Sequence, residues 1–452
     1  MMFKRQDTFI LNEEKKVCVI SNNLDNEVVK SFFEVLGLVK EDLENDIEVV
    51  NTLGKLSMKK VVIVKEDKVL EKDKLSKLFD FKEELLVLVD TFSDVKLLFE
   101  VLVDSSYRFL DFKSKDKKVA CGLSYYSSKD IEKEVNEGLV YGEAINNTKE
   151  LVNKPYNYLN AIDLARYALE FKRFENVEVT VYDKAQIEAM KMGAFLGVNK
   201  GSLDEPRLIH IRYRGDEDSK EIISLIGKGV MYDTGGYSLK TTTGMPNMKC
   251  DMAGSATVLG AMEVIARLRF KKNVDVVIAA TDNRIGDGAI VPDDILTAAN
   301  GMTIEIISTD AEGRLTLADA LWFAQQKGAT KLVDIATLTG AIVAALGKEF
   351  TGVFTNNQDY LNDLISVSEK AKEKLWQMPI SEGYRKELKS FSADMRNTGT
   401  SRTAGASVAA AFLEKFVEDN RPWIHLDIAA TAFDEKKGGS GVMVKTLAEF
   451  CK

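Results

Sequence analysis

The feature that most constrains this sequence is a regular alternation of short apolar, β-branched runs with longer runs of helical spacing. Within residues 156–452, seven runs are typical of strands, and helical runs such as GSATVLGAMEVIARLRF (254–270) lie between most of them. Strands that are apolar almost throughout predict a mainly parallel sheet with helices on both faces. Ligands of such sheets bind beyond the carboxyl ends of the strands. The predicted strands are VEVTVYD (177–183), RLIHIRY (207–213), IISLIGKGV (222–230), VDVVIAAT (274–281), MTIEIIS (302–308), KLVDIAT (331–337) and WIHLDIA (423–429).

Residues 1–128 show the same alternation, with strand-like runs such as KKVVIV (59–64) and ELLVLVD (84–90). A helical stretch follows from about Asp130 and ends near Pro155, because the residue before a proline disfavours helix. A chain of 452 residues exceeds the size at which one core keeps growing. We therefore predict an α/β protein of two domains, each a mainly parallel sheet flanked by helices. The N-terminal domain, with its linking helix, covers 1–150, and the C-terminal domain covers 151–452.

The charge and cysteine content narrow the class of protein. A net charge of −9 argues against nonspecific binding to nucleic acid or to a membrane surface, which needs a basic excess. No run reaches the roughly 18 apolar residues of a membrane span, and the N-terminus lacks the apolar centre of a signal peptide. The four cysteines have no CxxC spacing and are interpreted as reduced thiols. These features predict a cytoplasmic protein.

The chain has only two histidines, His210 and His425, and both lie in apolar strand-like runs. This nearly excludes a histidine-based catalytic triad and a zinc site built from several histidines. Both are expected to be hydrogen-bonded core residues. Any metal chemistry must therefore depend on carboxylates and on a less usual nitrogen ligand.

Charged residues follow three stretches interpreted as strand ends, at positions where core packing does not favour them. These stretches are SLIG (224–227), MPNMKC (245–250) and IEII (304–307). In STDAEGRL (308–315), Asp310 and Glu312 would point to the same side of an extended segment and repel each other unless they are neutralised. A metal ion would neutralise both, and more than one metal becomes plausible when Asp233 and Asp251 join them. Each of these residues, considered alone, also has a purely structural explanation. Asp251 suits a helix N-cap, Asp310 and Glu312 suit the start of the next helix, and Lys228 suits a lysine that reaches solvent from a strand end.

Several motifs, in this order, resemble those of the leucyl (cytosol) aminopeptidases, a family of dinuclear-zinc exopeptidases. The resemblance covers nearly all of residues 150–440 and is highly specific. It implies that the C-terminal domain is the catalytic metallopeptidase domain, and the family also has an α/β N-terminal domain. The motifs are ELVNKPYNYLNA, GKGVMYDTGGYSLK, NMKCDMAGSATVLGAM, STDAEGRL, VDIATLTGA, SFSADMRNTG with RTAGASVAAAFLEKF, and HLDIAATA.

The resemblance implies a role for each matching position. One zinc would be held by Lys228, Asp233, Asp251 and Glu312, and the other by Asp233, Asp310 and Glu312. Lys240 resembles the lysine that polarises the scissile carbonyl, and Arg314 resembles the arginine of a bicarbonate site. The residues that resemble those around the substrate are Met248, Thr337, Leu338 and Gly340.

Elementary chemistry agrees with these implied roles. A lysine binds a metal only as a neutral amine, and nitrogen beside carboxylates favours Zn²⁺, Mn²⁺ or Co²⁺ over Mg²⁺ or Ca²⁺. Two such ions can ionise a shared water near neutral pH, while one holds the free α-amine of a peptide. No histidine is suitable as a base, and Arg314 at a helix start suits an anion, so the bicarbonate that the resemblance implies at this position could accept the proton.

The predicted function is therefore release of leucine-like N-terminal residues from peptides by a metal-dependent aminopeptidase. Two alternatives remain open, a dinuclear hydrolase of another bond, such as a phosphoester, and an additional role in DNA binding. The resemblance also implies a homohexamer. Four positions depart from the family pattern, namely Ser308 in place of Asn, Met231 and Tyr232 in place of Thr-Phe, and Asp293 in place of Gly.

Overall fold

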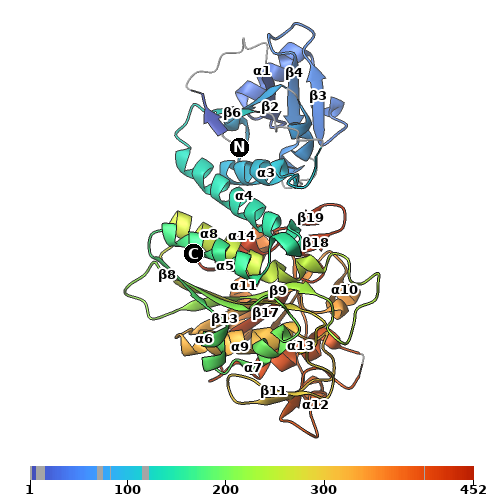
Figure 1. Cartoon of the computed structure of the whole chain (residues 1–452). Helices are drawn as coiled ribbons and strands as arrows, with labels where there is room; N and C mark the ends of the chain where they lie inside the picture. The colour runs from blue at the N-terminus through green and yellow to red at the C-terminus, as the bar shows by residue number, and fades with distance from the viewer. Residues whose placement is uncertain (1–2, 7–15, 69–74, 82, 115–121, 402) are drawn as a thin grey trace. The chain divides into compact units, whose positions relative to one another are not determined.

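A computed structural model gives the structure of the chain (Figure 1) and describes residues 3–6, 16–68, 75–81, 83–114, 122–401 and 403–452. The residues group into two compact units, 1–146 and 147–452. The helix predicted from about Asp130 to Pro155 is α4 (Glu132–Asn153), which crosses this division. In the described part of the chain, no helix is both long enough and apolar enough to span a membrane.

The first unit contains a six-stranded sheet in the order β1-β6-β5-β2-β4-β3. All its pairings are parallel except that of β3 with β4. Helices α1 (Glu27–Leu36) and α3 (Val95–Ser106) accompany it. The strands are β1 (Phe3–Arg5), β2 (Lys16–Ser21), β3 (Ile47–Asn51), β4 (Lys60–Val64), β5 (Glu84–Leu88) and β6 (Leu123–Tyr126).

The second unit is built on an eight-stranded sheet in the order β15-β14-β17-β13-β9-β10-β8-β7. Its central pairings, β10 to β9, β9 to β13 and β13 to β17, are parallel. The pairing β14–β15 is also parallel, whereas β14–β17, β8–β10 and β7–β8 are antiparallel. The prediction of a mainly parallel sheet is therefore confirmed, and the antiparallel pairings lie toward the two edges of the sheet. The strands are β7 (Val177–Tyr182), β8 (Arg207–Arg214), β9 (Ile223–Asp233), β10 (Asn273–Asn283), β13 (Lys331–Ala336), β14 (Thr351–Thr355), β15 (Leu375–Gln377) and β17 (Trp423–Asp427).

Helices cover both faces of the eight-stranded sheet (Figure 1). One face carries α5, α8, α11 and α14, and the other carries α6, α7, α9 and α13. Most side chains of β9 and all of β10 are buried, which explains why these strands lack polar alternation. The helices are α5 (Ala161–Leu169), α6 (Lys184–Ala189), α7 (Gly193–Asn199), α8 (Ala253–Leu268), α9 (Gly313–Gln326), α10 (Gly340–Leu346), α11 (Gln358–Ala371), α12 (Glu382–Lys386), α13 (Gly405–Glu414) and α14 (Val444–Phe450).

One strand prediction is wrong. The run 302–308 was expected to be a strand of the main sheet, but only Thr303–Glu305 (β12) is extended. It pairs with β11 (Ile295–Thr297) and β16 (Met395–Arg396) in a separate three-stranded sheet. An apolar run shows that a segment is buried without showing which sheet it joins.

The histidine predictions are confirmed. His210 lies in β8 with its Nε2 2.9 Å from Asp275 Oδ2, and His425 lies in β17 with its Nδ1 2.6 Å from Asp334 Oδ1. Both rings are buried, and both residues lie in strands of the eight-stranded sheet. Of the four cysteines, Cys18, Cys250 and Cys451 are free thiols, and Cys121 lies outside the described residues.

Candidate metal centre

Lys228, in the middle of β9, brings together three segments that are distant in the sequence. Its Nζ lies 2.8 Å from Asp251 Oδ2 and 3.0 Å from Glu312 Oε1. It also donates a hydrogen bond of 2.9 Å to the carbonyl oxygen of Thr337, just after β13. Asp251 belongs to the 3₁₀ turn Met248–Met252, and Glu312 immediately precedes α9. Of these residues, only Thr337 lies just beyond a strand end. The prediction that Lys228 and Asp251 follow strand ends is wrong, because Lys228 lies within β9 and Asp251 lies in a turn.

The lysine side chain reaches these acids because the first residue of α9 has no side chain. A Cβ atom placed on Gly313 would lie 2.4 Å from Cε of Lys228 and 2.5 Å from its Nζ. These separations are shorter than any normal van der Waals contact. The backbone at the start of α9 therefore packs directly against the buried ammonium group.

The second half of the cluster consists of Asp233, Asp310 and Glu312, which offer carboxylate oxygens that all lie within 4.8 Å of one another. Lys240 lies between two of them, with its Nζ 2.6 Å from Asp233 Oδ2 and 2.5 Å from Asp310 Oδ1. Asp233 and Glu312 are buried, whereas Asp310 is exposed. The structure therefore brings all five predicted metal ligands and Lys240 into one cluster.

The reason given from sequence for the convergence of Asp310 and Glu312 is wrong. They were expected to lie on one side of an extended segment. Glu312 instead has φ −80° and ψ −36°, a helical conformation. Ser308 supports the turn that precedes it, because its Oγ accepts a hydrogen bond of 3.3 Å from the backbone N–H of Asp310. An Asn side chain can make the same type of turn contact, so this departure from the family pattern preserves the local geometry.

The surroundings of the cluster disfavour the ionised form of two buried acids, Asp233 and Asp251, and favour that of Glu312. Burial, followed by the charge of Glu312, raises the pKa of Asp233 to about 6 despite the nearby lysines. Burial also raises the pKa of Asp251 well above its usual value. For Glu312, the attraction of Lys228 and Lys240 outweighs burial and lowers the pKa. Glu312 Oε2 is buried and has no hydrogen-bond partner among the described residues. Hard carboxylate oxygens, one amine and an unpaired buried oxygen together fit divalent cations.

Arg314, in the first turn of α9, is buried, and its Nη1 donates a hydrogen bond of 2.9 Å to the carbonyl oxygen of Asn397. Its Nε is buried without a hydrogen-bond partner in the described part of the chain. Burial lowers the pKa of Arg314 to about 10, although Glu312 and Asp427 oppose this effect. An unpaired guanidinium donor at a helix start is a suitable place for an anion.

Of the four predicted substrate residues, Thr337 contacts the cluster directly. Its carbonyl oxygen accepts a hydrogen bond from Lys228, and its hydroxyl donates one of 2.8 Å to Asp251 Oδ1. Leu338 follows it and is half-buried, and Gly340 is the exposed first residue of α10. Met248 opens the 3₁₀ turn that carries Asp251. Contacts of these four residues with substrate stay a prediction.

The remaining departures from the family pattern also have structural explanations. Asp293 has φ +78°, a left-handed conformation that glycine adopts freely and aspartate tolerates better than most residues. The hydroxyl of Tyr232 donates a hydrogen bond of 3.2 Å to the carbonyl oxygen of Met245, which Phe could not make. The same carbonyl accepts the N–H of Met248 at 3.2 Å. Met231 is simply a core residue, being 1% exposed.

Two neutral residues at the site were not found from the sequence. Asn283, the last residue of β10, donates a hydrogen bond of 2.8 Å to Asp233 Oδ1. Asn397 accepts a hydrogen bond of 2.8 Å from the N–H of Ile307 and donates one of 2.6 Å to the carbonyl oxygen of Ser308. Asn283 follows a predicted strand, so its position at a strand end is the sequence signal that points to it.

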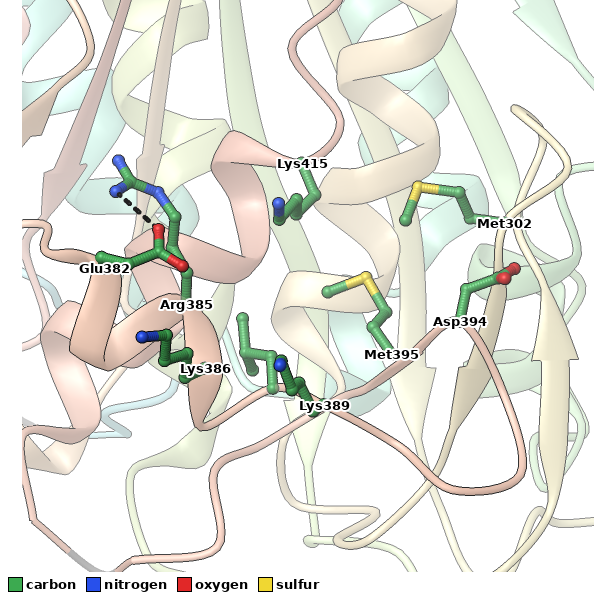
Figure 2. A pocket seen from close by; sticks show the side chains of 9 residues that line it. Met302, Glu382, Arg385, Lys386, Lys389, Asp394, Met395 and Lys415 are labelled. Atoms are coloured by element: carbon green, nitrogen blue, oxygen red, sulfur yellow. Dashed lines mark ion pairs between the residues drawn. The ribbon is translucent and has the colours of Figure 1, made fainter.

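A cavity of about 240 Å³ lies elsewhere in the second unit, beside α12 (Figure 2). Figure 2 shows Met302 and Met395 on one side of it and Arg385 and Lys386 on the other. None of the predicted site residues lines this cavity. Its volume is below the roughly 300 Å³ at which small-molecule sites usually begin. The ligating side chains, and not this cavity, therefore mark the candidate centre.

Comparisons with known proteins agree with the resemblance in the sequence. Residues 146–448 match the family model described as "Cytosol aminopeptidase family, catalytic domain". The chain is 42% identical over 391 residues to a "Probable cytosol aminopeptidase" of Bacillus licheniformis, covering 82% of this chain and 79% of that protein. It is 43% identical over 392 residues to one of Bacillus subtilis, covering 82% and 78% respectively. For one of Fusobacterium nucleatum the identity is 42% over 367 residues, covering 79% and 76%.

Proposed function

We propose a mechanism and a substrate class from a single starting point: the chain belongs to the cytosol aminopeptidase family and is a leucyl aminopeptidase-type peptidase. Members of this family are metal-dependent, and the acidic cluster provides suitable ligands. The comparisons do not support the two alternatives from the sequence, hydrolysis of another bond and DNA binding. The catalytic domain lies in the C-terminal part of the chain, and we place its start at residue 151.

The proposed substrate is a peptide with a free, leucine-like N-terminal residue. The observation that carries the proposal is the cluster of Lys228 with four carboxylates. One cation would be held by Lys228, Asp233, Asp251 and Glu312, and the other by Asp233, Asp310 and Glu312. Zn²⁺ suits this set best, with Mn²⁺ or Co²⁺ as alternatives, because one ligand is nitrogen. When bound, the pair of cations would bind the α-amine of the substrate and supply a hydroxide from water near neutral pH.

Lys240 supplies positive charge where the scissile carbonyl oxygen becomes an oxyanion. Its Nζ contacts two carboxylates of the second half of the cluster, Asp233 and Asp310, which fixes its position before substrate arrives. Burial opposes its charge, but Asp233 and Glu312 outweigh burial and raise the pKa of Lys240, so it stays protonated. Met248, Thr337, Leu338 and Gly340 would border the substrate side chain and backbone.

Addition of metal to metal-free protein tests the function. We expect no hydrolysis of a leucine chromogenic amide without metal, and activity after addition of Zn²⁺, Mn²⁺ or Co²⁺. The matched N-acetyl-leucine amide should not be cleaved, because its nitrogen cannot bind a cation as a free amine. Absence of activity with all three ions would contradict the proposal.

Titration of the metal-free protein with the same cations should show an affinity that rises from about pH 6 to about pH 8. Burial opposes the charge of Lys228, but Asp251, Glu312 and Asp233 outweigh burial and raise its pKa, so the metal-free protein carries a proton there. Ligation requires the neutral amine, and Asp251, whose pKa is also raised, must ionise. Both groups release protons on binding, so both make affinity increase with pH. A pH-independent affinity would exclude Lys228 as a ligand.

Arg314 and the first turn of α9 would hold a bicarbonate that accepts the proton from the attacking water. The support is the buried Nε of Arg314 without a partner among the described residues. We expect exchange of bicarbonate for chloride to lower kcat on the order of 10²-fold, the lower range for a general base. Addition of bicarbonate should restore the rate, and an unchanged rate after thorough exchange would contradict the assignment.

We also propose that the protein acts in the cytoplasm as a homohexamer, as the resemblance implies. The measurement is the mass in solution by light scattering, which should be six times the 50.3 kDa of one chain. A mass equal to that of one chain under assay conditions would contradict this assembly.

A further inference from the structure

The two carboxylate oxygens of Asp233 have different partners. Oδ1 accepts a hydrogen bond of 2.8 Å from the N–H of Gly235 and another of 2.8 Å from Nδ2 of Asn283. Oδ2 lies 2.6 Å from Nζ of Lys240. Two neutral donors therefore hold one oxygen, and the other oxygen faces the charged cluster. A carboxylate held in this way cannot rotate about its own bond without losing hydrogen bonds.

Asn283 is itself held firmly. It is 2% exposed and lies beside Asp233 in the parallel pairing of β10 with β9, just after a shift in register. Its carbonyl oxygen accepts hydrogen bonds from the N–H of Thr234 at 3.0 Å and from the Thr234 hydroxyl at 2.9 Å. Its main chain is thus fixed at the strand end, and its side chain has little freedom.

The same amide nitrogen also reaches the loop that carries Asp310. Nδ2 of Asn283 donates a second hydrogen bond, of 3.0 Å, to the carbonyl oxygen of Thr309. The hydroxyl of Thr309 in turn contacts the 235–238 turn, by donating to the Gly235 carbonyl oxygen at 2.5 Å and by accepting from the N–H of Ser238 at 2.7 Å. One amide group therefore joins the end of β9 to the residue immediately before Asp310.

A neutral amide is the side chain that this position requires. Both of its contacts accept hydrogen, so the group must donate twice, and an NH₂ group has two hydrogens to donate. A positive group would add to the charge that the site already receives from two lysines. A carboxylate would place another negative charge beside Asp233.

We propose that Asn283 is a positioning residue that fixes the orientation of Asp233 and its separation from Asp310, and thereby sets the affinity of the centre for divalent cations. The inference rests on the proposed function, because it assigns Asn283 to the same metal site. Partners that orient metal ligands in this way typically account for 10-fold to 100-fold in metal affinity.

The test compares Asn283→Ala with Asn273→Ala. Asn273 is a matched control because it is buried at the opposite end of β10, where its Nδ2 donates to the carbonyl oxygens of Asp216 at 2.8 Å and Ser219 at 2.9 Å. Asn283→Ala loses two side-chain hydrogen bonds, and Asn273→Ala loses three, because Oδ1 of Asn273 also accepts one of 3.2 Å from the N–H of Asp216. The control should therefore lose at least as much stability as Asn283→Ala. Competition with a chelator measures the affinity of each metal-free protein for Zn²⁺ and Mn²⁺. We expect a loss of about 10-fold to 100-fold for Asn283→Ala and less than about 2-fold for Asn273→Ala.

If the two variants bind the cations with equal affinity, the inference is overturned, because a structural role alone predicts no difference between them. If Asn283→Ala does not fold, Asn283→Ser replaces it, since the short hydroxyl keeps polarity without spanning both acceptors, and the same loss is expected. The wild-type titration separates the two proposals. If the wild type binds no divalent cation, the proposed function fails. If the wild type binds normally and the Asn283 variants do too, only the positioning role fails.

Discussion

Replacing Glu312 with Gln is expected to lower kcat/KM at least about 10³-fold, equivalent to about 4 kcal/mol of lost transition-state stabilisation. Glu312 is the carboxylate shared by both halves of the cluster, because it contacts Lys228 on one side and groups with Asp233 and Asp310 on the other. Gln has nearly the same shape but no charge and only one oxygen. Both cation positions should therefore weaken together.

Thermal unfolding with and without cation is the decisive measurement for this variant. A ligand that binds only the folded state stabilises it by about 2.7 kcal/mol at 100 times its Kd, so the wild type should gain this stability and Glu312→Gln should not. The two metal-free proteins should differ less, since the variant loses attraction to Lys228 but also removes repulsion on Asp233. Glu263→Gln, a buried change in α8, is the matched control and should keep activity. Cation-induced stabilisation that persists in Glu312→Gln would contradict its role as a ligand.

Replacing Lys240 with Met is expected to lower kcat about 10²-fold to 10³-fold while cation binding is retained. Lys240 contacts Asp233 and Asp310, and its side chain is 17% exposed, so it is accessible to a substrate. Met preserves most of the aliphatic length but cannot stabilise an oxyanion. Removing a positive charge beside two ligands should, if anything, strengthen cation binding.

Steady-state kinetics together with metal analysis separate this effect from that of Glu312. The expected pattern is a low kcat, a KM within a few-fold of the wild type, and full occupancy by cations. Lys331→Met, at the opposite end of the parallel strands, is a suitable control because its side chain pairs with Glu221 and not with the cluster. A Lys240 variant that loses its cations would identify Lys240 as a structural counter-charge and not as a group that acts on the substrate.

The sequence predicts the layered architecture well because apolar runs report burial directly. It does not predict strand direction, since an apolar strand such as β8 looks the same whether its neighbour β10 runs parallel or antiparallel. It also does not predict sheet membership. The run 302–308 is apolar like the others, yet its short strand β12 belongs to a smaller sheet.

The charged members of the candidate site could be predicted because acids and lysines at strand ends conflict with core packing. Asn283 and Asn397 could not be found in this way, because a neutral amide produces no such conflict. The direction of the Glu312 side chain also could not be predicted from the sequence, since it depends on a turn and a helix start and not on strand alternation. Ser308 shows the reverse case, where a departure in residue type leaves the turn contact to Asp310 intact.

The contact between Gly313 and Lys228 bears on any attempt to transplant this centre into another scaffold. A graft that copied only the acids and lysines would leave a Cβ atom in the space that Cε and Nζ of Lys228 occupy. The ammonium group would then be displaced from Asp251 and Glu312. The smallest set of residues that could be transferred therefore includes a glycine at the position of Gly313 as well as the acids and lysines, and a designer would have to specify both.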